Sequence, residues 1–260
     1  MKQKKRFTFS ILLSVVLLFG GCSPQKDSLN DKPSRPNESM APSGVFYETT
    51  DLGQDYVDRF LFLGESTTYH MKSRGVLSEG KNTKQVWAPK SGTVCLDESI
   101  QTIRIIYPET GEELSLADAL AKKRPERILL TFGLNGVVRK YKRGVDYYKS
   151  CYRNLIEIIR ENSPNTDIFL GSCYPVASNM DISNYPTNAA TINEYLNTLN
   201  EWCRDLAAEE GLNFLNFAPL LKDNQGFLKS EYQVGDGIHL TREAYLVVLD
   251  YIRTHDGKTQ

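Results

Sequence analysis

The chain has 260 residues, of which 40% are hydrophobic and 24% charged, and its formal net charge is -1. These values are typical of soluble globular proteins and exclude a largely disordered chain or an integral membrane protein. The near-neutral charge gives no electrostatic reason for a nucleic-acid partner, and none is expected.

The first 21 residues have the pattern of a signal peptide. Basic residues between positions 2 and 6 precede a mostly apolar run from Phe7 to Phe19, which is shorter than the roughly 20 residues that a membrane span needs. Two glycines then stand directly before Cys22. An uncleaved N-terminal anchor is the alternative interpretation of this segment.

Small residues directly before a cysteine resemble the lipobox of bacterial lipoproteins, in which the cysteine is acylated and becomes the new N-terminus. Phe19 departs from the leucine that is usual in that motif. The resemblance implies that residues 1–21 are removed and that Cys22 anchors the chain to the outer face of the bacterial cytoplasmic membrane. Residues 22–44 then form the lipidated cysteine and a polar, flexible tether, and residues 45–260 form the globular domain.

Strands and helices alternate along that domain. Short apolar runs predict buried strands, and longer stretches with apolar residues at helical spacing predict helices. The predicted strands cover 59–64, 127–132, 167–173 and 212–217. The predicted helices cover 67–74, 116–123, 146–162, 188–210 and 242–253, with Thr241 as the N-cap of the last one. Residues 99–116 predict a hairpin or loop excursion around a Thr-Gly turn.

Strands separated by helices of this length imply parallel β-α-β units. We therefore expect an α/β fold, specifically a three-layer α/β/α sandwich with a central parallel sheet. In such sheets, ligands bind at the carboxyl ends of the strands. The residues that directly follow each strand are thus the first candidates for a functional site.

Four polar residues stand at a predicted strand end or on a loop before a helix. Ser66 follows the first strand and can present its hydroxyl at the sheet edge, although a serine there is more often a helix cap. Asn135 follows the strand 127–132 and can donate its amide N–H to a developing oxyanion, although Asn-Gly is also a common turn pair. Asp236 precedes His239 by three residues on a loop before the last helix, so its carboxylate can orient the imidazole.

In this order, the residues resemble the SGNH (GDSL-type) serine hydrolase family. The matching segments are FLGES at 62–66, GLN at 133–135 and DGIHLT at 236–241, and KSGT at 90–93 resembles the family's glycine block. The resemblance implies a flavodoxin-like SGNH fold and the chemistry of a serine esterase. Glu65 departs from the aspartate that is usual before the serine, and we expect it to bond the backbone of the turn.

The resemblance also implies roles for the site residues. Ser66 would be the nucleophile, with Asp236 and His239 completing a triad. The backbone N–H groups of Ser66 and Gly92 and the side chain of Asn135 would form the oxyanion hole. No metal or organic cofactor is required.

The predicted location outside the membrane favours a small ester or an acetylated glycan as substrate, with O-acetylated sugars as the leading class. Tyr69, His70, Trp87 and Tyr174 lie near predicted strand ends and are candidate substrate contacts, although the aromatic residues fit core positions equally well. An O-acyltransferase with the same residues and a non-catalytic glycan-binding surface lipoprotein are the alternative functions. A solute-binding lipoprotein is disfavoured because such proteins usually have two lobes.

Four cysteines follow the predicted tether. They are Cys95, Cys151, Cys173 and Cys203. Their spacing includes no CxxC pair and no metal-ligand pattern. Disulfides are open to an exported chain, but we favour buried free thiols.

Overall fold

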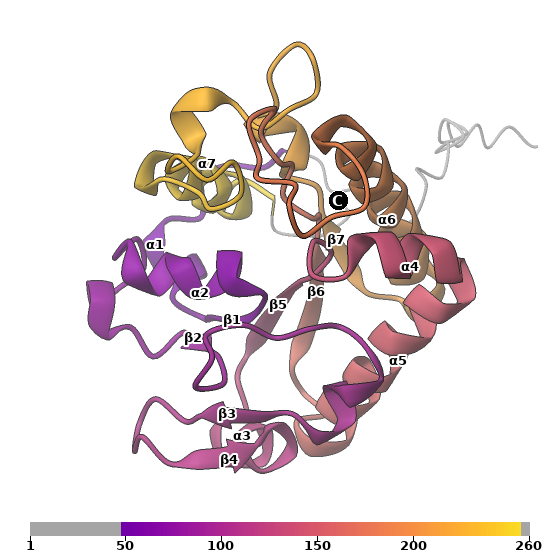
Figure 1. Ribbon diagram of the computed structural model, residues 1–260. Coiled ribbons are helices and arrows are strands. Elements are labelled where there is room, and N and C mark those ends of the chain that lie inside the picture. The colour runs from indigo at the N-terminus through magenta and orange to yellow at the C-terminus, as the bar shows by residue number, and fades with distance from the viewer. Residues whose placement is uncertain (1–47, 256–260) are drawn as a thin grey trace, which may run out of the picture. The chain divides into compact units, whose positions relative to one another are not determined.

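The computed structural model describes residues 48–255, which are built around a five-stranded sheet in the order β2-β1-β5-β6-β7 (Figure 1). The strands are β1 (Phe60–Gly64), β2 (Val86–Trp87), β5 (Arg127–Thr131), β6 (Asp167–Gly171) and β7 (Asn213–Leu215). Every neighbouring pair is parallel. This confirms the predicted α/β fold. The predicted signal peptide, Cys22 and the tether lie outside the described residues and stay predictions.

Helices cover both faces of the sheet (Figure 1). They are α1 (Gln54–Val57), α2 (Ser66–Ser73), α3 (Leu116–Lys123), α4 (Val137–Arg143), α5 (Val145–Asn162), α6 (Ala189–Glu210) and α7 (Arg242–Arg253). Apolar side chains of α3, α4, α5 and α6 join one hydrophobic cluster, and those of α1, α2 and α7 join a second cluster. The sheet therefore separates two cores, as a three-layer sandwich requires.

The alternation of side chains along each strand builds these two cores. In β1, Leu61 and Leu63 belong to the cluster under α3–α6, whereas Phe60 and Phe62 belong to the cluster under α1, α2 and α7. All five residues of β1 are buried. Because successive side chains of a strand point to opposite faces, a continuous apolar run fits a strand that is covered on both sides.

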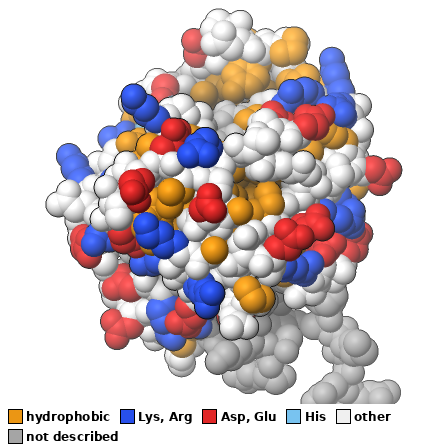
Figure 2. Space-filling model, turned by 90° about the horizontal axis from the view of Figure 1, so that it is seen from below, with side chains coloured by type: hydrophobic (Ala, Val, Ile, Leu, Met, Phe, Trp, Pro, Cys, Tyr) orange, Lys and Arg blue, Asp and Glu red, His pale blue; other side chains and the backbone are white. Residues whose placement is uncertain are grey.

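The predicted hairpin forms a separate two-stranded sheet. Strands β3 (Arg104–Ile106) and β4 (Glu113–Ser115) pair antiparallel, and the turn between them contains Gly111 at φ 77°. Figure 2 shows the molecule from this side, where acidic and basic side chains are interspersed. The surface ion pairs there include Lys122–Glu112 and Lys123–Glu109, and such exposed pairs contribute little to stability.

The four cysteines of the domain are free, and three of them are buried. This confirms the interpretation as free thiols over the disulfide alternative. Within residues 48–255, none of the helices combines the length and the apolar character needed to cross a bilayer.

The start of α6 offers a test of the local structure. Asn188 caps this helix, because its side-chain oxygen accepts the Thr191 N–H at 2.9 Å. Replacing it in Asn188→Ala should lower the free energy of unfolding by about 1 kcal/mol, since that N–H loses its partner. Urea unfolding of the full chain measures the change. Asn224→Ala, in an exposed turn, is the control, and equal effects of the two substitutions would contradict the capping role.

Candidate active site

Ser66 is the first residue of α2 and directly follows the turn that ends β1. Gly64 makes this turn possible, because a Cβ at its position would overlap with the carbonyl oxygen of Thr131 in β5 and the side chain of Thr68. Only glycine permits such a close approach of backbone to neighbour. The short junction places the Ser66 hydroxyl at the carboxyl end of the central strands.

The structure brings the three predicted triad residues together. The Oγ atom of Ser66 lies 2.9 Å from Nε2 of His239, and Nδ1 of His239 lies 2.6 Å from Oδ2 of Asp236. The second carboxylate oxygen of Asp236 accepts the backbone N–H groups of Ile238 and His239, both at 2.9 Å. These bonds hold the carboxylate and the imidazole in one continuous line toward the serine.

The loop that carries Asp236 and His239 is braced on both sides. The side-chain oxygen of Gln233 accepts the backbone N–H groups of Gly235 and Gly237 at 2.5 and 3.1 Å. Gly237 adopts φ 74°, and a Cβ at this position would lie 2.5 Å from Cα of Met180. A side chain at residue 237 would therefore push this loop away from its neighbour.

The hydrogen bonds to Asp236 favour its ionised form. Partial burial acts to raise the pKa of Asp236, but hydrogen bonds from the His239 imidazole and from two backbone N–H groups outweigh it and hold the pKa below its ordinary value. An ionised Asp236 can only accept a hydrogen bond. Nδ1 of His239 is therefore the donor in this bond, and Nε2 is the ring nitrogen that faces the hydroxyl of Ser66.

Two of the predicted substrate contacts lie beside this line. The His70 ring packs on the His239 ring, with 4.3 Å between the centroids. Burial, followed by the neighbouring His239, lowers the pKa of His70 and so favours its neutral form. The Tyr69 side chain is 37% exposed, and its ring lies against Gly92.

The other two predicted substrate contacts are wrong. Trp87 is 0% exposed and packs edge-on against Tyr107, in the hydrophobic cluster that also contains side chains of α3–α6. Tyr174 is 7% exposed and stacks on Phe217 in the opposite core. Both side chains are held inside the domain by apolar packing, so neither ring is exposed for stacking on a sugar.

The predicted oxyanion hole is only partly assembled. The Ser66 N–H and the Asn135 side-chain amide both donate to Oγ1 of Thr93, at 3.0 and 2.9 Å. The N–H of Gly92 instead donates to the carbonyl of Pro89 at 2.9 Å. The expectation that Gly92 contributes a free N–H is therefore wrong for this conformation, because a turn within its own loop uses that donor.

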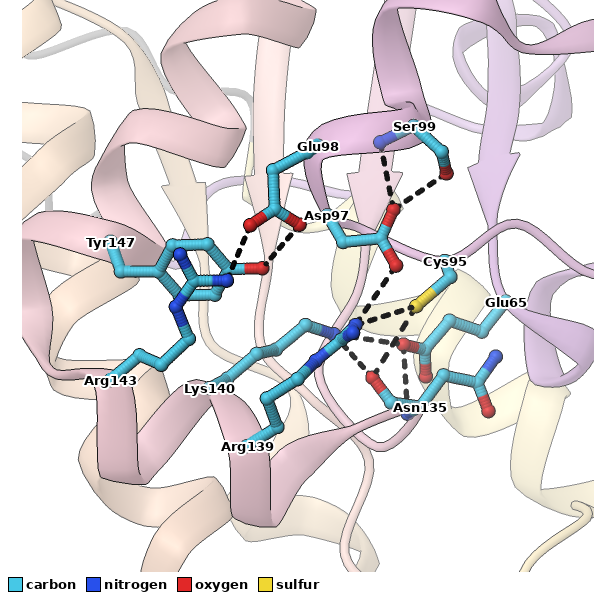
Figure 3. A network of polar contacts seen from close by, with 10 residues as sticks. All are labelled: Glu65, Cys95, Asp97, Glu98, Ser99, Asn135, Arg139, Lys140, Arg143 and Tyr147. Carbon is cyan, nitrogen blue, oxygen red and sulfur yellow. Dashed lines mark hydrogen bonds and ion pairs between the residues drawn. The ribbon is translucent and has the colours of Figure 1, made fainter.

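A buried carboxylate holds the Asn135 loop in place. Glu65 accepts the consecutive backbone N–H groups of Gly133, Leu134 and Asn135, each at 3.0 Å. The ammonium group of Lys140, on α4, lies 3.6 Å from the same carboxylate and donates to the carbonyl of Asn135 at 2.6 Å (Figure 3). As expected, Glu65 bonds the backbone of the turn, and it does so across the sheet from β1 to the end of β5.

The same network continues toward solvent (Figure 3). The Arg139 guanidinium donates to the Asp97 carboxylate at 2.9 Å, and Arg143 pairs with Glu98. These contacts tie α4 to the segment that follows the loop with Gly92. In the part of the chain that the structure describes, no group of three or more His, Cys, Asp and Glu side chains is arranged to hold a metal ion.

Comparison with known proteins decides the family. The model of the GDSL-like lipase/acylhydrolase family matches residues 62–247, a span that contains Ser66, Asn135, Asp236 and His239. The chain belongs to this family. Membership places it among the GDSL-type carboxylic ester hydrolases. Among curated protein sequences, none is significantly similar to this chain.

Solved structures resemble this GDSL-like acylhydrolase in fold. A DUF4886 family protein from Bacteroides uniformis is 16% identical, with a TM-score of 0.50 over 75% of this chain and 82% of that chain. A GDSL-like lipase from Bacteroides thetaiotaomicron is 16% identical, with a TM-score of 0.48 over 78% of this chain and 89% of that chain. An acetyl-xylooligosaccharide esterase variant from Geobacillus is 14% identical, with a TM-score of 0.42 over 75% of this chain and 92% of that chain.

Three residues of this GDSL-like site were not predicted from the sequence. Thr93 bonds both candidate oxyanion donors, Lys140 pairs with Glu65, and Gln233 braces the Asp-His loop. Thr93 directly follows Gly92, so the segment that resembles the family's glycine block was a sequence signal for this residue. Lys140 lies in a basic helix whose sequence gives no sign that one of its lysines is buried.

The Glu65–Lys140 pair can be tested by removing the cation. Lys140 is fully buried, so Lys140→Met should leave the Glu65 carboxylate without a counter-charge and lower the free energy of unfolding by about 3–5 kcal/mol. Denaturant unfolding measures the loss. Lys142→Met, at an exposed position of the same helix, should change stability by less than about 0.5 kcal/mol. A wild-type midpoint for Lys140→Met would rule out a stabilising ion pair.

Proposed function

We propose that the protein is a serine esterase that removes acyl groups, chiefly O-acetyl groups, from carbohydrate esters. The observation that carries this proposal is the line of two hydrogen bonds from Ser66 through His239 to Asp236, at 2.9 and 2.6 Å. A serine hydroxyl is a weak nucleophile at its ordinary pKa and needs an adjacent base. The line supplies that base and orients it.

In the first half-reaction, Oγ of Ser66 attacks the ester carbonyl carbon while Nε2 of His239 takes the hydroxyl proton. The Asp236 carboxylate, which accepts from Nδ1, stabilises the positive charge that forms on the imidazole. The tetrahedral intermediate then collapses. The bond to the alcohol oxygen breaks, and the proton on Nε2 passes to that oxygen, so the alcohol leaves and the acyl group stays on Ser66.

In the second half-reaction, a water molecule attacks the acyl carbon and gives its proton to Nε2 of His239. Collapse of the second tetrahedral intermediate returns that proton to Oγ of Ser66 and releases the carboxylic acid. Negative charge on the carbonyl oxygen is stabilised in both intermediates by the N–H of Ser66 and the amide of Asn135. Each such donor typically contributes about 3 kcal/mol to the transition state.

The exposure of the triad supports a carbohydrate-borne ester as substrate. The side chains of His239 and Asp236 are 23% and 44% exposed. The bulky alcohol portion of a carbohydrate ester can therefore approach them. Tyr69 is exposed next to Gly92 and can stack on a sugar ring. Export and a lipid anchor at Cys22, which we also propose, would bring the domain to cell-wall and capsular glycans.

The non-catalytic alternative is disfavoured by the same geometry. A glycan-binding module has no need of a serine, a histidine and a carboxylate in hydrogen-bonded order. An O-acyltransferase would use identical residues and would differ only in which hydroxyl attacks the acyl-Ser66 intermediate. Its distinction from a hydrolase therefore rests on the products.

The triad assignment predicts the kinetics of three variants of the full chain with p-nitrophenyl acetate. Ser66→Ala and His239→Ala should lower kcat by about 10⁴-fold to 10⁶-fold, because each removes a group that reacts. Asp236→Asn should cost about 10⁴-fold, because an amide favours the wrong imidazole tautomer. Ser150→Ala, on the exposed surface of α5, is the control. Full activity of Ser66→Ala would overturn the proposed function.

The products identify the acceptor. With an acetylated xylo-oligosaccharide as substrate and an unacetylated oligosaccharide added as acceptor, we expect one free acetate for each ester lost and an unmodified acceptor. Titration of acetate and mass spectrometry of the sugars measure both. Acetyl groups on the acceptor would contradict hydrolysis while keeping the serine chemistry, and p-nitrophenyl octanoate tests in parallel whether a longer acyl chain is accepted.

A further inference from the structure

The hydroxyl of Thr93 lies where two hydrogen-bond donors converge. Its Oγ1 atom accepts the backbone N–H of Ser66 at 3.0 Å and the side-chain amide of Asn135 at 2.9 Å. These are the two groups to which the proposed mechanism assigns the carbonyl oxygen of the substrate. One oxygen bound by both donors at these distances has the coordination that an oxyanion would have.

The loop around Thr93 also uses the third expected donor. The N–H of Gly92 donates to the carbonyl of Pro89 at 2.9 Å. The loop is anchored at its two ends, where the Ile106 N–H donates to the carbonyl of Ala88 and the Val94 N–H donates to the carbonyl of Gly64. Residues 89–93 thus form a short turn between two fixed points, and this turn satisfies all three donors from within the protein.

A substrate must displace this arrangement. The backbone N–H of Ser66 has one hydrogen, and it is already directed at Thr93. A neutral ester carbonyl is no stronger an acceptor than a hydroxyl, so it gains little by replacing it. The charged oxygen of the tetrahedral intermediate accepts hydrogen bonds that are roughly twice as strong as neutral ones.

We propose that the Thr93 hydroxyl occupies the oxyanion hole of the resting enzyme and leaves it when the substrate oxygen enters, with residues 89–93 moving as a gate. The inference rests on the proposed function, because it concerns the oxyanion hole of the same active site. It explains why both donors are hydrogen-bonded to a side chain of the protein itself. It also makes the hole selective for the transition state, which competes with Thr93 better than the ground state does.

Variants that lack the hydroxyl test the gate. In Thr93→Ala and in the equally shaped Thr93→Val, the competing acceptor is gone, so kcat/KM for p-nitrophenyl acetate should rise about tenfold, mainly through a lower KM, as the loss of one or two neutral hydrogen bonds predicts. Thr93→Ser keeps the hydroxyl and should behave as wild type. Lys90→Ala, at an exposed position of the same loop, is the control for changes that do not touch the donors.

Inhibition by methylboronic acid gives a second measurement. Its boron bonds to Oγ of Ser66, and one of its oxygens enters the oxyanion hole, so the inhibition constant should fall about tenfold in both variants without the hydroxyl. Circular dichroism identifies a variant that fails to fold, and the other then carries the test. A fall in kcat of about 100-fold or more in Thr93→Ala and Thr93→Val would overturn the proposal, because Thr93 would then donate to the transition state.

Unchanged kinetics and inhibition in both variants would also overturn it. The failure of this inference is distinguishable from the failure of the proposed function. Wild-type hydrolysis that disappears in Ser66→Ala supports the serine mechanism whatever the Thr93 variants do. If wild-type activity survives in Ser66→Ala, the proposed function fails, and the inference fails with it.

Discussion

The carboxylate of Glu65 ties the ends of two strands together, and the geometry of the site depends on it. Glu65 lies directly after β1 and directly before Ser66. Its carboxylate accepts three consecutive backbone N–H groups of the loop that follows β5. Buried backbone donors without partners are costly, so this single side chain keeps the loop from turning outward. The buried Lys140 balances its charge. The positions of Ser66 and Asn135 relative to each other are therefore set by one buried anion and its cation.

Most of the fold could be predicted, because it depends on local patterns. The apolar runs at β1, β5 and β6 and the amphipathic helices α5, α6 and α7 carry their own periodicity in the sequence. The predicted hairpin, the helix at 116–123 and the cap at Thr241 also match the structure. The two-residue strand β2 and the short helix α4 were not predicted, since each is too short to show a period and depends on contacts with distant segments.

The sequence predicted the site residues only where the residues next to them in the chain indicate their role. Ser66, Asp236 and His239 stand at turns that a parallel sheet brings to one edge, and the structure places them within hydrogen-bond distance. Whether an aromatic side chain points outward depends on packing, which is why Trp87 and Tyr174 were wrong. The hydrogen bond from the Asn135 amide to the Thr93 hydroxyl joins residues 42 positions apart. No local sequence pattern predicts a hydrogen bond between residues so far apart in the chain.

The candidate triad combines two parts with different folding requirements. The pair of Asp236 and His239 is separated by three positions and is stabilised by bonds within its own loop, whereas the contact between Ser66 and His239 spans 173 positions. Contacts between distant positions bear the loop-closure entropy of the chain between them. The acid–base pair therefore depends mainly on short-range contacts, whereas its contact with Ser66 forms only when the loop before α7 lies against the carboxyl end of β1. The contact between Ser66 and His239 therefore forms only in a domain whose N-terminal strand β1 and C-terminal loop lie side by side.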